Sequence, residues 1–485
     1  MGQPINDGGH APLQPKRIVP ASMTVKLASF GIGSVLIAVN LMGNSLMFAH
    51  EGQRGAGSLT TSFQALLLGV CGGALMGVGQ MIGKPIGQQN FELAGQKVSA
   101  AYAMTAILTG ISTLAYGLTY FVFPAVAPHA TAEAASTYFL VSALGNWPAL
   151  ALVTMGQVAF QMGDWVSPLA SSAVYRLLSV AVSYLLSAPA GLNAVGIGLG
   201  NLIAPWVSYL GMHFWLKKRQ FAAINSTPLS KEIVKEHLKP SMQFGGKMSL
   251  QRVTEWGNLA IITAVLGAMS GQNLVAINPS LQFMTLFNLF SQGIGLAGSM
   301  IVTPLLAKRN TVIETGDRSE ENKGTVAEAH AHIKSAVTKS VVSGIVVNGA
   351  LAVALFFARK PIVDFFLSDS VSKEAHEVAQ TALWINGIGL VTDAVRIITG
   401  TLLNSWEKLY FQNIVAILTM TVVGVPLGWV LGKQGSDENA VLPMFAMRTG
   451  MIFLAALINS IELYRTLKAD DRQVQQFSTP GLAAV

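Results

Sequence analysis

The sequence predicts an all-α integral membrane protein in which twelve transmembrane helices form two six-helix lobes. Composition is the first support for this fold class: 51% of the 485 residues are hydrophobic and only 11% are charged. A soluble globular domain carries about 25% charged residues, so most of the surface of this chain is expected to face lipid. A regular series of apolar runs is the second support, and a repeat between the two halves is the third.

The apolar runs fall into two groups of six. A helix needs about 20 mainly apolar residues to cross the bilayer, because its backbone must satisfy its own hydrogen bonds there. The runs are 27–49, 60–82, 98–122, 136–158, 166–187 and 192–216, then 244–268, 275–303, 336–357, 379–403, 410–432 and 440–464. We therefore predict an N-terminal lobe at 27–216, a linker at 217–243 and a C-terminal lobe at 244–464. Polar tails at 1–26 and 465–485 complete the chain.

The basic residues predict the orientation. Most of the 31 Lys and Arg residues lie on one side when both termini are placed in the cytoplasm, and this is the side where positive residues concentrate. We expect a multi-pass protein of the cell (inner or plasma) membrane. The basic residues are not grouped with aromatic residues on a polar face, so no nucleic-acid partner is expected. A second polar break near 304–339 is expected to hold a surface helix, and its His330 and His332 fit solvated side chains better than metal ligands.

The two halves resemble each other in short patterns of small and apolar residues. At a constant offset of 219, four residues of "GQMIGKP" match four of "GSMIVTP": Gly79, Met81, Ile82 and Pro85 match Gly298, Met300, Ile301 and Pro304. At an offset of 244, Gly145 and Gly156 match Gly389 and Gly400. Two lobes duplicated in the same orientation are typical of transporters built as a parallel repeat.

Ionisable residues inside the predicted spans are the candidate functional residues, because a charge in the hydrocarbon core costs about 2.5 kcal/mol or more. Six lie well inside: Arg176, Arg252, Glu255, Asp393, Arg396 and Arg448. Two acid and base pairs have a spacing of three residues, which places each pair on one helix face.

Two interpretations of these pairs stay open. Glu255 and Asp393 could bind a proton, a cation or a cationic solute, or each acid could be neutralised by its own arginine in a structural pair. For Arg176 and Arg448, packing is as good an explanation as ligand contact, and for Arg176 so is snorkelling toward the interface. The chain contains no phosphate-binding loop, HExxH motif or GxSxG elbow, so we expect neither an enzyme nor ATP-driven transport by this chain alone.

Several segments resemble the multidrug and toxic compound extrusion (MATE) family of transporters. Residues 364–403 are similar to the family's ninth loop and tenth helix, 271–301 to its eighth helix, and 145–170 to its fourth helix and following turn. The resemblance extends over residues 20–465 and is nearest to the bacterial NorM-type branch.

The resemblance implies a V-shaped pair of lobes around a central cavity. It further implies export of amphipathic or cationic organic compounds in exchange for Na⁺ or H⁺, with no other cofactor. Glu255 and Asp393 match acids of the seventh and tenth helices, so they would bind the coupling ion or the substrate, with Na⁺ as a candidate ligand. Asn278 matches an asparagine of the eighth helix. The expected partners are a small organic substrate and the lipid bilayer, and the chain is expected to function as a monomer.

The chain departs from the family pattern at several positions. Asn44, in "NSLM", stands where the family usually carries a first-helix Asp, and an amide cannot exchange a proton. "NSWEKLY" at 404–410 replaces a glycine-rich turn. Arg252 and Arg396 are not part of the pattern, and each brings a fixed positive charge beside an acid. Two alternatives to cation export therefore stay open: a transporter of an anionic or lipid-linked solute, and a membrane scaffold that does not transport.

Overall fold

The computed structural model describes residues 23–50, 54–125, 129–218, 230–269, 271–367, 372–434 and 441–479. Within these ranges the chain forms helices joined by short turns, and no strand occurs in them. Nine helices in the described residues are long and apolar enough to cross a bilayer, judged by length and composition. The all-α membrane fold predicted from the sequence is thus confirmed.

The first half of the chain forms six helical rods, some of which are interrupted. Their bounds are α1 Met23–His50; α2 Arg54–Leu67 with a π-helical turn at Leu68–Gly72, α3 Gly73–Met76 and α4 Val78–Gly87; α5 Phe91–Val122; α6 His129–Ser142 with a 3-10 turn and α7 Asn146–Gln161; α8 Val166–Ser187; and α9 Asn193–Lys218.

The second half repeats this arrangement with longer helices. Their bounds are α11 Lys231–Met269; α12 Gly271–Thr315; α13 Glu320–Phe366; α14 Lys373–Leu403, followed by a 3-10 turn, η4, at Asn404–Trp406; α15 Leu409–Ala416 with a π-helical segment at Ile417–Gly424 and α16 Val425–Gln434; and α17 Val441–Ser478. Each predicted span thus falls on a helical rod.

The two predicted polar breaks are shorter than the sequence suggested. Residues 231–243 of the predicted linker belong to α11 and continue without interruption into the span. The break at 304–339 is almost entirely helical, because α12 continues to Thr315 and α13 begins at Glu320. Gly316 adopts a left-handed φ of 69° at the end of α12, and the Ser319 hydroxyl caps α13 by accepting from the Asn322 amide.

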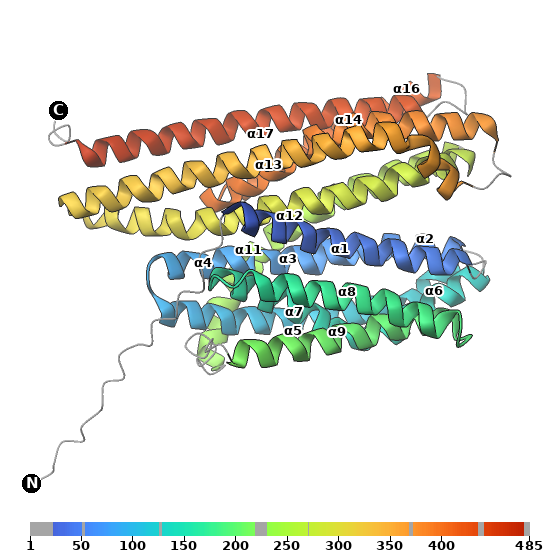
Figure 1. Cartoon of the computed structure of the whole chain (residues 1–485), viewed down its shortest axis with the longest axis horizontal. Helices are drawn as coiled ribbons and strands as arrows, with labels where there is room; N and C mark the ends of the chain where they lie inside the picture. The colour runs from blue at the N-terminus through green and yellow to red at the C-terminus, as the bar shows by residue number, and fades with distance from the viewer. Residues whose placement is uncertain are drawn as a thin grey trace, which may run out of the picture.

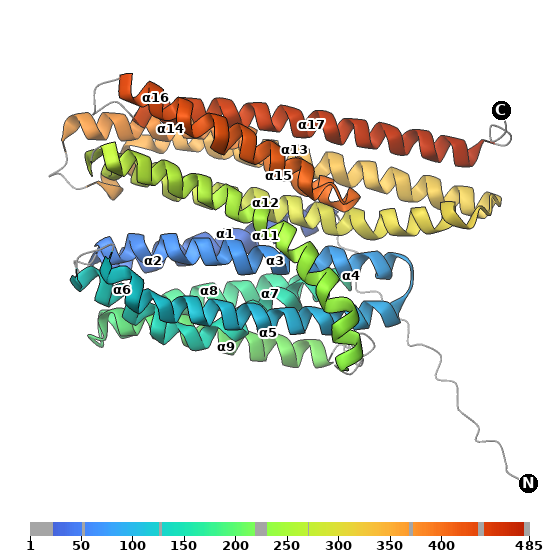
Figure 2. The ribbon, with the colours of Figure 1, turned by 180° about the vertical axis from the view of Figure 1, so that it is seen from behind.

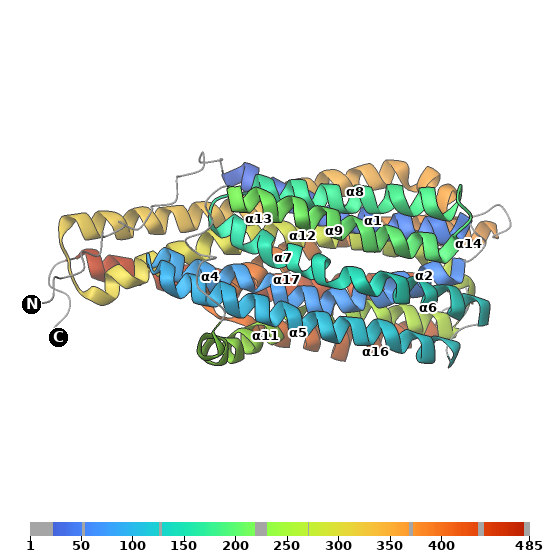
Figure 3. The same cartoon turned by 90° about the horizontal axis from the view of Figure 1, so that it is seen from below.

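The helices form two layers that correspond to the two lobes (Figures 1 and 2). Helices α1–α9 make up one layer and α12–α17 the other, while α11 crosses obliquely from the N-terminal lobe to the C-terminal lobe (Figure 2). Three helices, α12, α13 and α17, extend beyond the others at one end of the molecule (Figure 3). We call this the projecting end, and the predicted topology places it in the cytoplasm.

The two lobes are related as the sequence repeat predicted. Gln80 of α4 and Ser299 of α12, which are 219 residues apart, form a hydrogen bond of 2.6 Å between Nε2 and Oγ. Residues that contact their own counterparts lie next to the axis that relates the halves. The pattern with the offset of 244 supports the same relation between the lobes. Gly156 packs against Pro168, and their counterparts 244 residues later, Gly400 and Gln412, also pack against each other.

The lobes are in close contact in the half of the molecule toward the projecting end. A Cβ on Gly87 of α4 would collide with the Pro304 main chain of α12, and one on Gly79 would collide with Met300. A buried apolar cluster there combines Leu27 and Phe160 of the first half with residues of the second. Toward the opposite end α1 and α12 diverge (Figure 1).

The outer surfaces of both layers are apolar. Large hydrophobic side chains such as Leu114, Phe121 and Phe357 are 71%, 74% and 77% exposed. Exposed apolar surface on this scale is explained by contact with lipid chains, so the fold is that of a multi-pass integral membrane protein.

Candidate functional site

A buried ionic cluster lies inside the C-terminal lobe. Asp393 of α14 is 2% exposed, and its Oδ1 accepts a hydrogen bond of 2.6 Å from Arg396 Nε. Arg448 of α17 is also buried, and its guanidinium nitrogen lies 3.8 Å from Asp393 Oδ2. One carboxylate thus faces two guanidinium groups, so positive charge exceeds negative charge among these three described side chains.

The structure brings together Asp393 and Arg396 as their spacing of three residues predicted. It also adds Arg448, whose role the spacing did not reveal because it comes from another helix. The one signal in the sequence was that Arg448 is an ionisable residue within a predicted span. Since both acid oxygens face arginine, the place of a coupling cation beside Asp393 is already occupied by positive charge in this arrangement.

Arg252 lies where α11 meets the N-terminal lobe. It is 2% exposed, and a Cβ on Gly73 of α3 would collide with its Cγ. The close packing of α11 here is supported by Ser249, whose hydroxyl donates to the Val70 carbonyl at 2.6 Å. Glu255 belongs to α11 and Asn278 to α12, but their side chains lie outside the described residues. The second acid and base pair, and a Na⁺ site at Glu255 and Asp393, therefore stay predictions.

Asn44 belongs to a chain of buried hydrogen bonds in the N-terminal lobe. Its amide donates to the Tyr138 hydroxyl at 3.3 Å, and that hydroxyl donates to Gln64 Oε1 at 3.1 Å. Asn201 of α9 donates to Asn44 Oδ1 at 3.4 Å. The position that usually carries an acid in the family is thus part of a neutral polar network that joins α1, α2, α6 and α9.

Asn40, one turn before Asn44, is a second polar residue that the sequence did not single out. It donates to the Ser179 hydroxyl of α8 at 3.2 Å and accepts from Arg176 at 3.4 Å. The sequence could have identified Asn40 by its spacing of four residues from Asn44, which puts both amides on one face of α1. Among the predicted site residues whose side chains are described, Asn44 thus belongs to a group in the N-terminal lobe that is separate from Asp393 and Arg396 in the C-terminal lobe.

A cavity of about 510 Å³ lies between the lobes at the projecting end. Its walls come from α4, α5, α11, α12 and the turn η4. Lys84 of the N-terminal lobe and Glu407 of the C-terminal lobe form an ion pair of 2.9 Å across it. The Lys84 hydrogen bond and charge hold the pKa of Glu407 below its usual value.

Glu407 has unusual backbone geometry. Its φ of 61° lies in the left-handed region, which favours glycine because a Cβ is strained there. This is the turn where the sequence replaces the family's glycine-rich pattern with "NSWEKLY". A left-handed conformation of a non-glycine residue costs about 1–3 kcal/mol, so the surrounding turn holds Glu407 in this conformation beside the inter-lobe ion pair.

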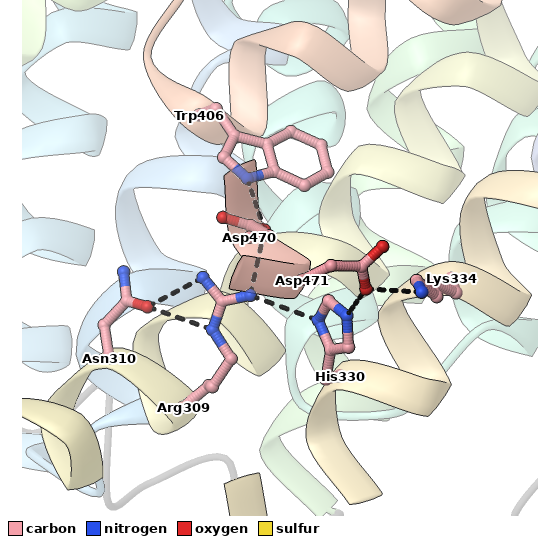
Figure 4. Close-up of polar contacts among 7 residues, drawn as sticks. All are labelled: Arg309, Asn310, His330, Lys334, Trp406, Asp470 and Asp471. Carbon is pink, nitrogen blue, oxygen red and sulfur yellow. Dashed lines mark hydrogen bonds and ion pairs between the residues drawn. The ribbon is translucent and has the colours of Figure 1, made fainter. Parts of the chain in front are cut away.

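A second ionic network joins the ends of α12, α13 and α17 at the projecting end (Figure 4). Arg309, only 1% exposed, donates to Asp470 at 2.8 Å and lies 3.4 Å from His330 Nδ1. His330 Nε2 lies 2.6 Å from Asp471, which also pairs with Lys334. Trp406 of η4 donates to Asp470 at 3.0 Å, so the network reaches the turn that carries Glu407.

The fold of this chain is similar to several solved structures. Neither protein-family models nor curated proteins match the sequence. An outward-facing multidrug resistance MATE family transporter of the MOP superfamily matches with a TM-score of 0.79 at 14% identity, over 93% of this chain and 97% of the other. A MATE transporter of Vibrio cholerae matches with a TM-score of 0.78 at 15% identity, over 92% and 97%.

A MOP superfamily transporter from Pyrococcus furiosus, described as having a binding pocket of reverse polarity, matches with a TM-score of 0.77 at 15% identity. The match covers 93% of this chain and 96% of that one. The matches cover more than nine-tenths of this chain and therefore include most of both lobes. The chain therefore has the fold of the MATE transporters, as its sequence predicted.

Proposed function

We propose that this chain is a secondary transporter of the MATE type, which moves a small organic solute across the membrane. The observation that carries the proposal is the buried Asp393–Arg396–Arg448 cluster inside one lobe of a fold whose matched structures are transporters. Buried charges in a membrane domain are costly. Their retention in the middle of a lobe is explained by a solute or ion that interacts with them.

The arrangement of the lobes supports transport by alternating access. The two lobes meet near the projecting end through Gln80–Ser299, Lys84–Glu407 and the contact of α4 with α12. A solute would enter between the lobes from the opposite end, where α1 and α12 diverge. Its binding would change the pairing in the C-terminal cluster, and the lobes would then separate at the projecting end.

The charge of the cluster favours a solute with an anionic group. Asp393 is shared by two arginines, so the described side chains of the cluster carry one more positive than negative charge. A carboxylate or phosphate group of a solute would balance this excess, with guanidinium groups as its hydrogen-bond donors. The reverse polarity described for the Pyrococcus furiosus protein is a parallel within the same fold.

Export of cations in exchange for Na⁺ or H⁺ is the second candidate. The 3.8 Å distance between Arg448 and Asp393 is longer than a hydrogen bond, so a cation could replace Arg448 beside the carboxylate. Glu255, the acid predicted in α11, would then provide the second carboxylate. In this mechanism Asp393 alternates between arginine and the coupling ion.

Counterflow in proteoliposomes separates the two candidates. Vesicles loaded with citrate are expected to accumulate external labelled citrate, and vesicles loaded with ethidium are expected not to accumulate ethidium. Repeating both assays with and without Na⁺, at two pH values, identifies the coupling ion. Uptake of ethidium but not citrate would establish the second candidate instead, and no exchange of either solute would speak against the proposal.

A pair of variants of α17 links transport to the cluster. Arg448→Gln is expected to abolish citrate exchange, because it removes one of the two guanidinium groups at Asp393. Arg465→Gln changes an exposed arginine of the same helix and is expected to leave exchange unchanged. Equal exchange by both variants would show that the cluster has no part in transport.

A further inference from the structure

Arg176 is a buried cation in the middle of the N-terminal lobe. It lies halfway along the 22 residues of α8, roughly 15 Å from either end of the helix, and is 8% exposed. An arginine side chain in this position cannot extend to the membrane surface, so snorkelling does not explain it. Its guanidinium group stacks on the Tyr175 ring at 3.9 Å and donates one long hydrogen bond to Asn40.

Among the described residues of the N-terminal lobe, no carboxylate lies beside Arg176 to neutralise it. Its sequence from residue 27 to 216 contains four acids: Glu51, Glu92, Glu133 and Asp164. Glu92 is exposed in the first turn of α5, and Glu133 is at the surface with His129. Glu51 follows the end of α1 and lies outside the described residues.

Asp164, the buried acid among the four, is fully engaged at the start of α8. Its carboxylate accepts hydrogen bonds from the Val166 and Ser167 amides and from the Ser167 hydroxyl. In the described part of the chain, Arg176 therefore has a charge without an ionic partner. A buried guanidinium group without an ionic partner favours the binding of an anion beside it.

Arg176 lines a small cavity with both polar and apolar walls. The cavity has a volume of about 60 Å³, and its other polar walls include Ser112, Ser142, Asn146, Tyr175 and Asn201. No carboxylate occurs among the described residues that line it. Arg176 Nε, which can only donate, is buried without a hydrogen-bond partner in the described structure. The cavity thus places a buried positive charge without a described ionic partner among polar side chains.

We infer that this cavity is a binding site for a monovalent inorganic anion of halide size, held by Arg176. Water could satisfy the unpaired N–H group but could not balance the charge. Organic solutes are too large, because sites for drug-sized ligands have volumes of about 300–1,000 Å³. The inference concerns the resting protein, so it holds whether or not the transport proposed above is correct.

Bromide provides the probe because it can be located by its anomalous scattering. The full chain, purified in detergent, would be crystallised in sodium bromide. An anomalous peak in the cavity, within about 3.5 Å of the Arg176 guanidinium group, is expected. The absence of bromide from the cavity in the wild-type protein would overturn the inference, and this result does not depend on any variant.

Thermal unfolding provides an independent measurement of binding. At equal ionic strength, bromide is expected to raise the unfolding temperature of the wild-type protein above that in gluconate, which is too large for the cavity. Arg176→Gln is expected to abolish this rise, while Arg318→Gln, which changes an exposed residue, retains it. An equal bromide effect in Arg176→Gln, or no effect in the wild type, would contradict the inference.

Discussion

Asp393 lies between two guanidinium groups that come from different helices. Arg396 is one turn along α14 and donates to the carboxylate at 2.6 Å, whereas Arg448 approaches from α17 at 3.8 Å. All three side chains are at least nine-tenths buried. A buried pair adds little net stability when intact, but the loss of one partner is costly because the other charge stays buried.

Asp393→Asn is therefore expected to destabilise the C-terminal lobe. The variant places two guanidinium groups side by side without the carboxylate, and the free energy of unfolding should fall by about 3–5 kcal/mol. Chemical unfolding in detergent measures the change, and the exposed Asp364→Asn on α13 is the control. The double variant Asp393→Asn, Arg448→Gln should recover part of the loss. If Asp393→Asn alone were as stable as the wild type, Asp393 would not be needed to neutralise the two arginines.

The sequence predicted part of this site for a clear physical reason. The contact between Asp393 and Arg396 follows from helix geometry, which the spacing of three residues specifies. The contact with Arg448 depends on how α14 packs against α17, and no spacing along one helix determines that. The sequence did not point to Asn40, because the candidates that did not come from the family resemblance were selected by their charge and the side chain of asparagine is neutral. The pairing predicted for Arg252 and Glu255 stays a prediction.

The ends of α12, α13 and α17 are held together by charged and polar contacts between the helices. The residues at 304–339 are polar, and the sequence predicted a break there with one surface helix. The structure instead extends two helices past the bundle and ties them to α17 through Arg309, His330, Asp470 and Asp471 (Figure 4). A polar segment can remain helical outside the membrane when its charges are paired across helices. This tertiary pairing is not visible in local composition.

Arg309→Gln is expected to loosen these three helix ends together. The substitution leaves Asp470 without its guanidinium partner and removes the contact with His330. Hydrogen exchange should accelerate in residues 304–339 and at the end of α17, while exchange in α5 and α8 should not change. Arg318→Gln, in the exposed turn between α12 and α13, is the matched control. Acceleration spread over the whole chain would instead indicate global destabilisation.

The contact between the lobes includes an ion pair whose strength depends on pH. Lys84 holds the pKa of Glu407 below its usual value, so the carboxylate is charged at neutral pH. The attraction is fully present above the ordinary Glu pKa of about 4.3 and is lost as the pH falls through the lowered value. Both side chains are largely exposed, so the pair contributes at most about 1 kcal/mol.

Acidification is therefore expected to widen the projecting end. Spin labels on α4 and η4 should report a longer inter-lobe distance in the wild type only when the pH falls below the ordinary Glu pKa of about 4.3. Glu407→Gln should show the longer distance at neutral pH as well, since its side chain carries no charge. Glu407→Gly should also lose the pair, but the backbone would be relieved of strain because glycine tolerates a φ of 61°. A wild-type distance that does not change with pH would exclude a role for the pair.

Gly87, the last residue of α4, determines how closely the lobes approach each other. A side chain at this position would meet the main chain of Pro304 in α12, and a main chain cannot move aside as a flexible side chain can. Gly87→Val should therefore shift the lobes toward an arrangement that is open at the projecting end. If the free-energy difference between the closed and the open arrangement changed by only 1 kcal/mol, the ratio of the two populations would change about fivefold.

Cysteine labelling measures this opening. Thr311 lines the inter-lobe cavity, and the native Cys71 is buried, so Thr311→Cys provides one accessible thiol. Maleimide is expected to react faster with this thiol when Gly87→Val is also present. Gly110→Val is the matched control, because a Cβ on Gly110 of α5 meets no atom within 4 Å. Equal labelling rates in the two valine variants would show that the contact of α4 with α12 does not limit the separation of the lobes. A faster rate in Gly87→Val alone would identify this backbone contact as the point about which the lobes close.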